Sequence, residues 1–183
     1  GAACVERHAR PGSTRRGRSA LAPGPASAAP GEGYDGRMGN RADIAKVTGF
    51  WREAGPGKWF NGGEAFDAEC GARLGDLHMA AARRECDHWQ DDPDGLVALM
   101  VLLDQVPRNI FRGTGHAFAT DPLALSLARR GVDAGLDRAV AQDLRVFVYL
   151  PFEHSEALAD QQRAVALFEA LGDPMYLRYA QGF

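Results

Sequence analysis

Five polar side chains follow a long apolar run in the middle of the sequence, and their types could either bind an anion or lock a turn in place. The apolar run spans residues 96–103, and Pro107 interrupts the pattern shortly after it. Polar groups that lie beside a hydrophobic core need hydrogen-bond partners from the protein or from a ligand. The residues concerned are Asp104, Gln105, Arg108, Asn109 and Arg112.

The spacing of these residues supports two interpretations. Asp104 and Arg108 stand four positions apart, so one turn of helix would pair them. In the structural interpretation this is a buried ion pair that fixes the chain beside Pro107. In the functional interpretation Arg108 and Arg112 bind a carboxylate or phosphate group, and Asn109 donates a hydrogen bond to it.

A second polar group lies about fifty residues later, at His154, Ser155 and Glu156. Consecutive side chains point in different directions, so these three cannot form a catalytic triad with one another. His154 or Glu156 could still act as a general base in a hydrolase, with Arg108 or Arg112 stabilising negative charge. The sequence gives no indication of the bond that such an enzyme would cut.

A metal site is the remaining chemical possibility for these two groups. Asp104, His154, Glu156 and Asp160 are residue types that bind metals, but their spacing matches no metal-binding motif. We therefore predict no metal and no cofactor.

Helices are the elements that must position these residues. Apolar side chains recur at helical spacing from residue 43 onward, and no alternating pattern with hairpin turns occurs, which predicts an all-α domain. An Asp followed by Pro predicts helix starts at Asp92, Asp121 and Asp173, with each Asp as the N-cap. Pro107 predicts a break or kink of the helix beside Asp104 and Gln105.

The apolar periodicity also predicts which helix faces are buried. The helix after Pro93 is apolar nearly all round and is therefore expected at the centre of the fold. Trp59 and Phe60 follow the first helix in a turn and are expected to cover the core rather than to stack on a ligand. The helices are expected from Asp43 to Gly55, from Phe66 towards Trp89, from Pro93 to Pro107, from Pro122 to Gly135, from Arg138 to Pro151, from Ser155 to Gly172, and from Pro174 onward. Their expected inner faces are Ile44, Val47, Phe50 and Trp51; Phe66, Cys70, Leu74, Leu77 and Ala81; Leu96, Leu99, Met100, Leu102, Leu103 and Val106; Leu123, Leu127, Ala128 and Ala134; Val140, Leu144, Phe147 and Val148; and Leu158, Gln162, Val165, Phe168 and Leu171.

Length and composition favour one globular domain preceded by a tail. The chain has 183 residues, 45% of them hydrophobic, and a net charge of -3, which gives no reason to expect a nucleic-acid partner. Residues 1–37 are rich in Gly, Ala, Pro, Ser and Arg and have no apolar period. We expect this segment to be a disordered tail or an extension translated upstream of a start at Met38. The domain itself is expected over residues 38–183.

The cysteines and the apolar runs predict the redox compartment of the protein and its relation to membranes. Cys4, Cys70 and Cys86 are odd in number and lack C-x-x-C spacing, so neither a disulfide framework nor a zinc site is predicted, and a reducing cytoplasm is expected. The longest uncharged apolar run, over residues 95–103, is far shorter than the ~20 residues that cross a bilayer. No membrane partner is therefore predicted, and the oligomeric state stays open.

Several motifs resemble those of the bacterial family called domain of unknown function 924. They are residues 102–114 (LLDQVPRNIFRGT), 149–156 (YLPFEHSE), 117–121 (AFATD) and 160–162 (DQQ), together with Phe50-Trp51 and Trp59-Phe60. The resemblance covers about residues 43–180. It implies an all-α fold of antiparallel helical hairpins, similar to that of tetratricopeptide repeats, and it implies no particular activity.

The sequence departs from that family's pattern in three places. Val106 stands where the family usually has an aromatic residue, and Glu153 stands where it has an uncharged one. The family also continues into a motif Phe-Gly-Arg-Phe-Pro-His-Arg-Asn, which is absent after Gln181. The domain is therefore expected to be incomplete at its C-terminus, and a part of the site is expected to be missing with it.

Three functional hypotheses follow from the sequence. The leading one is a binding module whose groove, lined by the two polar groups, holds a small anionic ligand or a peptide. The second is a hydrolase that uses His154 or Glu156. In the third, both polar groups only stabilise the fold.

Overall fold

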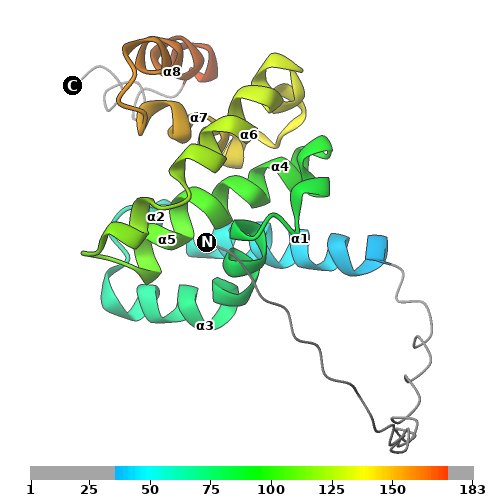
Figure 1. Ribbon diagram of the computed structural model, residues 1–183, viewed down its shortest axis with the longest axis vertical. Helices are drawn as coiled ribbons and strands as arrows, with labels where there is room; N and C mark the ends of the chain where they lie inside the picture. Colours follow the sequence, from blue (N-terminus) through cyan, green and yellow to red (C-terminus); the bar gives the residue numbers. More distant parts are fainter. Residues whose placement is uncertain (1–35, 173–183) are drawn as a thin grey trace, which may run out of the picture. The chain divides into compact units, whose positions relative to one another are not determined.

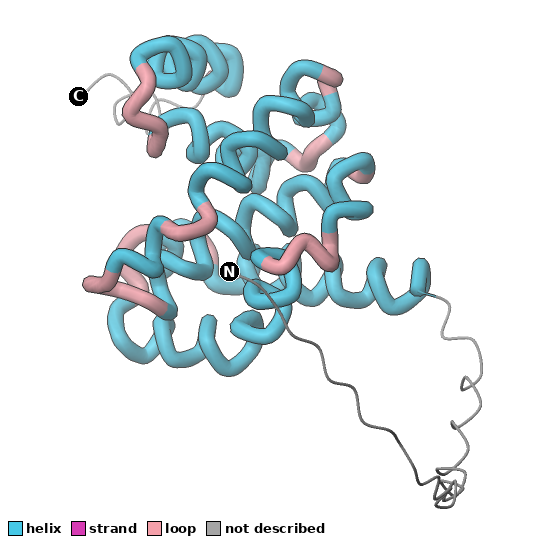
Figure 2. The backbone as a smooth tube through the Cα atoms, in the orientation of Figure 1, coloured by secondary structure: helices cyan, strands magenta, loops and turns pink. Residues whose placement is uncertain are grey.

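Helices make up every regular element in the part of the chain that the structure describes. The computed structural model describes residues 36–172, with side chains from residue 40, and no strand occurs among them (Figure 2). The elements are α1 (Gly36–Ala54), α2 (Pro56–Trp59), α3 (Gly63–Ala82), the 3-10 turn η1 (Asp87–Asp91), α4 (Pro93–Met100), the π-helical turn η2 (Val101–Gln105), α5 (Val106–Ile110), the 3-10 turn η3 (Gly115–Phe118), α6 (Asp121–Asp133), the 3-10 turn η4 (Leu136–Ala139), α7 (Gln142–Glu153) and α8 (Leu158–Leu171). The predicted all-α class is confirmed.

The helix α4 occupies the centre of the core. It packs against α1, α6 and α7, and Figure 1 shows it running between α1 and α6. Its residues from Gly95 to Met100 are buried, and so are all five residues of η2. A helix that is apolar on every side must be enclosed by others, and the predicted central position is confirmed.

The remaining helices cover this centre in neighbouring pairs. The helix α3 packs against α5, and α7 packs against both α6 and α8. The predicted inner face of α1 is buried at Ile44, Val47, Phe50 and Trp51. Trp51 meets Phe147 of α7 edge to face, with ring centroids 5.7 Å apart. These contacts connect the first helix of the described region to the penultimate one.

The two aromatic residues of the predicted turn lie in different environments. Trp59 belongs to the short helix α2, is buried, and donates a hydrogen bond of 2.6 Å from Nε1 to the carbonyl oxygen of Trp51. Phe60 is 51% exposed, so the expectation that it covers the core is wrong. The difference follows from geometry, because consecutive side chains of a helical turn point in different directions.

Several predicted helix limits are wrong by a few residues. The first helix begins at Gly36 instead of Asp43, so it includes the last two residues of the predicted extension. The helix α7 begins at Gln142 instead of Arg138, because Arg145 donates to the carbonyl oxygens of Arg138 and Val140 and holds that segment in a separate turn. It also continues through Pro151 to Glu153.

Two predicted caps and two predicted faces are also corrected. Thr120 occupies the N-cap position before α6, because the Asp121 carboxylate is bound to Arg108 instead. Ala157 takes that position before α8, because the Ser155 hydroxyl donates to Asp160. As a result α8 buries Asp160, Ala164 and Phe168, whereas Leu158 and Gln162 are exposed, and Ala134 after α6 is exposed as well.

Other sequence predictions lie partly or wholly outside the described residues. They concern most of the tail over residues 1–37, the helix start at Asp173, and the expected truncation after Gln181. The described residues lie within one compact unit.

Candidate functional site

A π-helical turn replaces the predicted break at Pro107. The amide of Val106 donates to the carbonyl oxygen of Val101, five residues earlier, and the chain continues directly from α4 through η2 into α5. Pro107 lies in the first turn of α5, where its missing N–H costs least. Of the break or kink expected there, the break is wrong, because the helix continues and widens by one residue beside Asp104.

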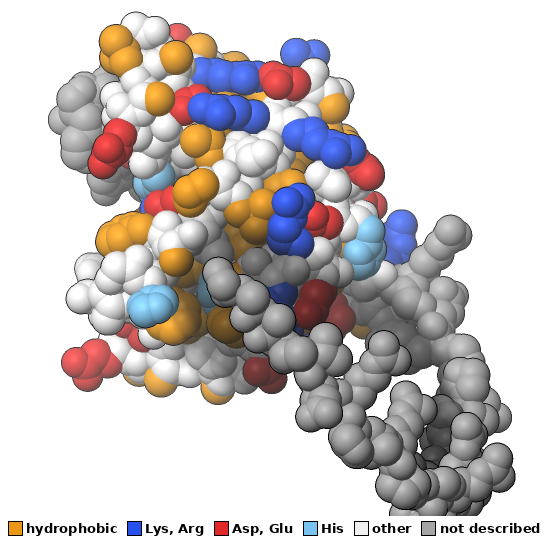
Figure 3. Space-filling model, viewed as in Figure 1, with side chains coloured by type: hydrophobic (Ala, Val, Ile, Leu, Met, Phe, Trp, Pro, Cys, Tyr) orange, Lys and Arg blue, Asp and Glu red, His pale blue; other side chains and the backbone are white. Residues whose placement is uncertain are grey.

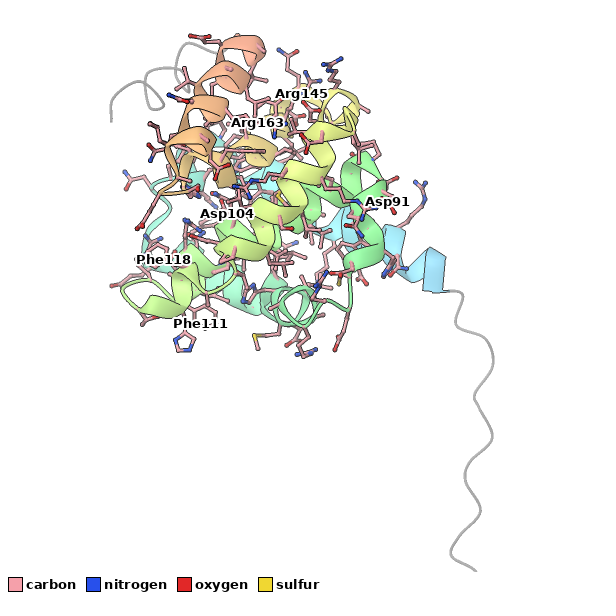
Figure 4. The ribbon with its side chains drawn as sticks, turned by 45° about the horizontal axis from the view of Figure 1, so that its top comes forward. Asp91, Asp104, Phe111, Phe118, Arg145 and Arg163 are labelled. Carbon is pink, nitrogen blue, oxygen red and sulfur yellow. The ribbon has the colours of Figure 1, made fainter. Side chains whose placement is uncertain are left out.

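Asp104 is the buried centre of the polar residues. Its side chain is fully buried, and three side chains contact its carboxylate. Gln105 Nε2 donates to Oδ2 at 2.6 Å, Arg108 Nη1 lies 3.2 Å from Oδ1, and His154 Nδ1 lies 2.7 Å from the same oxygen. Figure 4 shows Asp104 among the helices, while Phe111 and Phe118 lie near the loop at the edge. The two polar groups of the sequence thus meet at one carboxylate.

Arg108 has a full set of acidic partners. Its two terminal nitrogens donate to the two carboxylate oxygens of Asp121 at 2.8 and 2.9 Å, and Nη1 also donates to the carbonyl oxygen of Asp104 at 2.6 Å. Burial opposes the charge, but the hydrogen bonds to Asp121 and the charges of Asp104 and Asp121 raise the pKa of Arg108 above its ordinary value. The ring of Phe118 lies over the guanidinium group, with its centroid 5.4 Å from Cζ.

Arg112, in the turn after α5, is paired in the same way with a carboxylate of α3. It donates from Nε and Nη2 to the carboxylate of Asp67 in α3, at 2.6 and 2.8 Å. Nη2 also donates to Asn109 Oδ1 at 3.2 Å, and Asn109 Nδ2 donates to the carbonyl oxygen of Gln105 at 3.0 Å. The hydrogen bond to Asp67 raises the pKa of Arg112. Both arginines of the expected anion pocket are therefore held by carboxylates of the protein.

His154 is partly exposed, as are Arg108 and Arg112. It follows α7 directly, and its side chain is 25% exposed. Within the described part of the chain, Nδ1 contacts Asp104 and no hydrogen-bond partner is present for Nε2. The preceding residue, Glu153, is partly buried. Burial raises the pKa of the Glu153 carboxyl, while His154 lowers it and Asp104 raises it further.

Ser155 and Glu156 do not join this cluster. The hydroxyl of Ser155 donates to Asp160 Oδ2 at 2.7 Å, and Arg129 donates to the same carboxylate from Nε and Nη2. Asp160 therefore has a lowered pKa, chiefly because of the hydrogen bonds from Arg129. Glu156 is exposed and makes no hydrogen bond to a described residue. Figure 3 shows basic and acidic side chains interspersed over α6 and α8, as this pairing requires.

The described residues offer little for metal or thiol chemistry. Nowhere in residues 40–172 do three His, Cys, Asp or Glu side chains converge in a way that could hold a metal ion. Cys70 and Cys86 are buried free thiols, and burial raises the pKa of Cys70 to about 12. Among the described helices, moreover, there is none whose length and apolar character would let it cross a bilayer.

Comparison with known proteins places the chain in a family. Residues 47–181 match the family model described as bacterial protein of unknown function (DUF924). The chain belongs to the DUF924 family. The solved structure of a protein of unknown function from Agrobacterium tumefaciens is similar to this chain, with 50% identity, 78% of this chain and 81% of that chain covered, and a TM-score of 0.75. No curated protein matches.

Sequence reasoning missed four residues that complete the site of this DUF924 protein. Asp67 and His78 each act on a residue far away in the sequence, and Thr120, although it lies in the motif 117–121, gave no sign that its hydroxyl binds Leu103 O. Asp121 was predicted to be a helix N-cap, because Pro122 follows it as in the other Asp-Pro motifs. The Asp-Pro motif alone cannot show that an arginine competes for the carboxylate.

A separate hollow of the DUF924 domain contains none of the predicted site residues. It lies between α1 and the start of α4 and has a volume of about 310 Å³. Arg41, Arg52, Asp92 and Asp94 supply its charged lining. Arg52 is already paired with Asp143 at 2.7 Å, and Asp92 caps α4.

Proposed function

We propose that this protein binds a small polar ligand at His154, with Asp104 holding the imidazole ring in place. One observation carries the proposal: a fully buried carboxylate lies 2.7 Å from Nδ1 of a histidine whose side chain is 25% exposed. In a neutral imidazole, a buried carboxylate that accepts the Nδ1 proton leaves Nε2 as the acceptor. The ligand therefore donates a hydrogen bond to Nε2.

The charges around His154 narrow the class of ligand. The guanidinium groups of Arg108 and Arg112 are each engaged by a carboxylate through two hydrogen bonds. An anion would have to displace one of these internal partners, which is costly in a partly buried site. Glu153 adds a negative charge beside the ring. We therefore propose an uncharged or cationic hydrogen-bond donor, in place of the anion that the sequence favoured.

Three probes of matched size test the ligand class. Benzyl alcohol, benzylamine and benzoate share a ring that suits the exposed Phe118 beside Arg108, and they differ in charge and in hydrogen bonding. We expect the alcohol and the ammonium form of the amine to shift the ¹⁵N resonance of His154 Nε2. His154→Ala is expected to abolish binding, while His116→Ala, a change at an exposed histidine, leaves it intact. Stronger binding of benzoate, or binding without a shift at His154, would refute the proposal.

A hydrolase is the second candidate, and the Asp104–His154 pair favours it. A carboxylate that orients imidazole is the arrangement of a general base, here one that would activate water. Ser155 is bound to Asp160 and Glu156 is exposed, so we assign the base to His154. A broad panel of ester, amide and phosphoester substrates tests this candidate. Turnover must fall in both His154→Ala and Asp104→Asn, and turnover unaffected by these changes counts against it.

We also propose a location in the cell for this protein. Cys70 and Cys86 are buried in the folded domain and form no disulfide bond. Free thiols of this kind are typical of a reducing compartment, which supports the proposed cytoplasmic location.

A further inference from the structure

Four consecutive backbone carbonyls around Asp104 accept hydrogen bonds from side chains. Leu102 O accepts from His78 Nδ1 at 2.8 Å, and Leu103 O accepts from Thr120 Oγ1 at 2.5 Å. Asp104 O accepts from Arg108 and Gln105 O from Asn109, at 2.6 and 3.0 Å. Side chains from α3 and from the residue before α6 thus reach the backbone of η2.

The π turn and Pro107 together explain why the first two carbonyls need these partners. In an α-helix Leu102 O would accept from the amide of Val106, but that amide donates to Val101 O. Leu103 O would accept from the amide of residue 107, and proline has none. Leu102 and Leu103 are fully buried, so water cannot replace the missing donors without cost.

We propose that His78 and Thr120 are positioning residues for Asp104, which they hold towards His154. His78 occupies the carbonyl that would otherwise draw the Val106 amide back into α-helical register. A slip by one residue turns a helical side chain by roughly 100° about the axis, which would take Asp104 away from His154. Thr120 anchors the start of α6, and its neighbour Asp121 then reaches Arg108.

The surroundings of both residues fit this role. His78 is 4% exposed, and its ring meets that of Phe111 at a centroid distance of 5.7 Å. Burial lowers the pKa of His78, so the ring is neutral at pH 7 and Nδ1 can carry the proton that Leu102 O accepts. His154 contacts Asp104 from η2, whose Oδ1 also binds Arg108 from α5, and it interacts electrostatically with Glu153 from α7.

This inference rests on the proposed role of His154, but its test uses the ligand-free protein. The measurement is the exchange rate with solvent of the Nδ1 proton of His154, together with the tautomer shown by the two ¹⁵N shifts. Thr120→Val keeps the side-chain shape and removes the hydroxyl donor. We expect this proton to exchange at least tenfold faster in Thr120→Val and at the normal rate in Thr120→Ser. Thr114→Val is the matched control, because the Thr114 hydroxyl also binds a carbonyl, that of Phe111, outside the cluster.

The outcomes separate positioning from a merely structural role. A folded Thr120→Val protein that has lost stability but keeps the slow Nδ1 proton would overturn the proposal. If Thr120→Val does not fold, His78→Leu provides the same test through Leu102 O. Failure of both variants to fold also counts against the proposal, since the two bonds then serve the fold as a whole. Failure of the benzyl probes to bind would refute the proposed function without changing the Nδ1 result.

Discussion

Glu153 is the charged residue of the cluster whose burial is least compensated. Its pKa is raised, chiefly by burial, so the folded protein binds the proton more tightly than the unfolded chain does. The contribution of Glu153 to stability is therefore fully present below the unfolded pKa of 4.5 and is lost as the pH rises through the folded value. We expect Glu153→Gln to raise the free energy of unfolding at pH 7 by about 0.5 kcal/mol, after allowing for solvent screening.

Urea unfolding at pH 7 and at pH 4 measures this effect. The gain should shrink at pH 4, where the native carboxyl is already protonated. Glu156→Gln, a change of the same chemistry at an exposed position, should leave stability unchanged at both pH values. A loss of stability in Glu153→Gln at pH 7 would show that the carboxylate has a partner that compensates its burial.

Cys70 is expected to be inert in the folded protein. Burial is the main cause of its pKa of about 12, and the charges of Asp67 and Glu69 add to it. Because the thiolate is the reactive form, alkylation by iodoacetamide at pH 8 should be roughly 100-fold or more slower in the native protein than in urea. Peptide mapping by mass spectrometry reports Cys70 separately from the other cysteines. Equal rates in both states would mean that α3 opens readily.

The contacts of single residues show where sequence reasoning reaches its limit. The spacing of four residues predicted the Asp104–Arg108 pair, which the structure contains at 3.2 Å. The stronger partner of Arg108 is Asp121, and the partner of Arg112 is Asp67, 45 residues away. Such pairs depend on how helices pack, and no local spacing encodes that.

At the level of elements, the two Asp-Pro motifs within the described residues behave differently. Asp92 accepts a hydrogen bond from the amide of Gly95 at 2.9 Å and caps α4, whereas Asp121 has been taken by Arg108. We expect Asp92→Ala to cost about 1 kcal/mol of stability and Asp92→Asn to cost little, because asparagine is also a good cap. Asp121→Asn should be costly, since it removes one of the two carboxylates that neutralise the largely buried Arg108 and the one that binds it through two hydrogen bonds.

Urea unfolding of Asp92→Ala, Asp92→Asn and Asp121→Asn measures these differences in the free energy of unfolding. Equal losses for the two asparagine variants would contradict this prediction, because only one of the two positions depends on charge.

The helix break expected at Pro107 does not occur, for a related reason. Proline does remove a donor there, but His78 and Thr120, 24 and 17 residues from the carbonyls that they bind, restore the hydrogen bonds. The local sequence shows that proline lacks the amide donor, but it cannot show which distant side chains replace that donor.

For the described domain as a whole, the central position of α4 requires close approach by its neighbours. The apolar sequence of α4 predicted that position, but it could not show which glycines permit the approach. A Cβ atom at Gly95 would lie 2.3 Å from the carbonyl oxygen of Trp89 in η1. A Cβ atom at Gly131 of α6 would lie 2.4 Å from a methyl carbon of Leu96. The first neighbour is backbone, while the second is the end of a buried side chain.

These distances predict an order of stability for three Gly→Ala variants. Gly95→Ala should cost about 2–3 kcal/mol, since the backbone of η1 must move. Gly131→Ala should cost about 1–2 kcal/mol, because Leu96 can change rotamer only within a packed core. Gly75→Ala, on α3 with no atom within 4 Å of the new methyl group, should instead gain about 0.5–1 kcal/mol from helix propensity. Chemical unfolding ranks the three. A Gly95 variant as stable as the Gly75 variant would show that η1 is not fixed against α4, and the packing around the central helix would then need a different explanation.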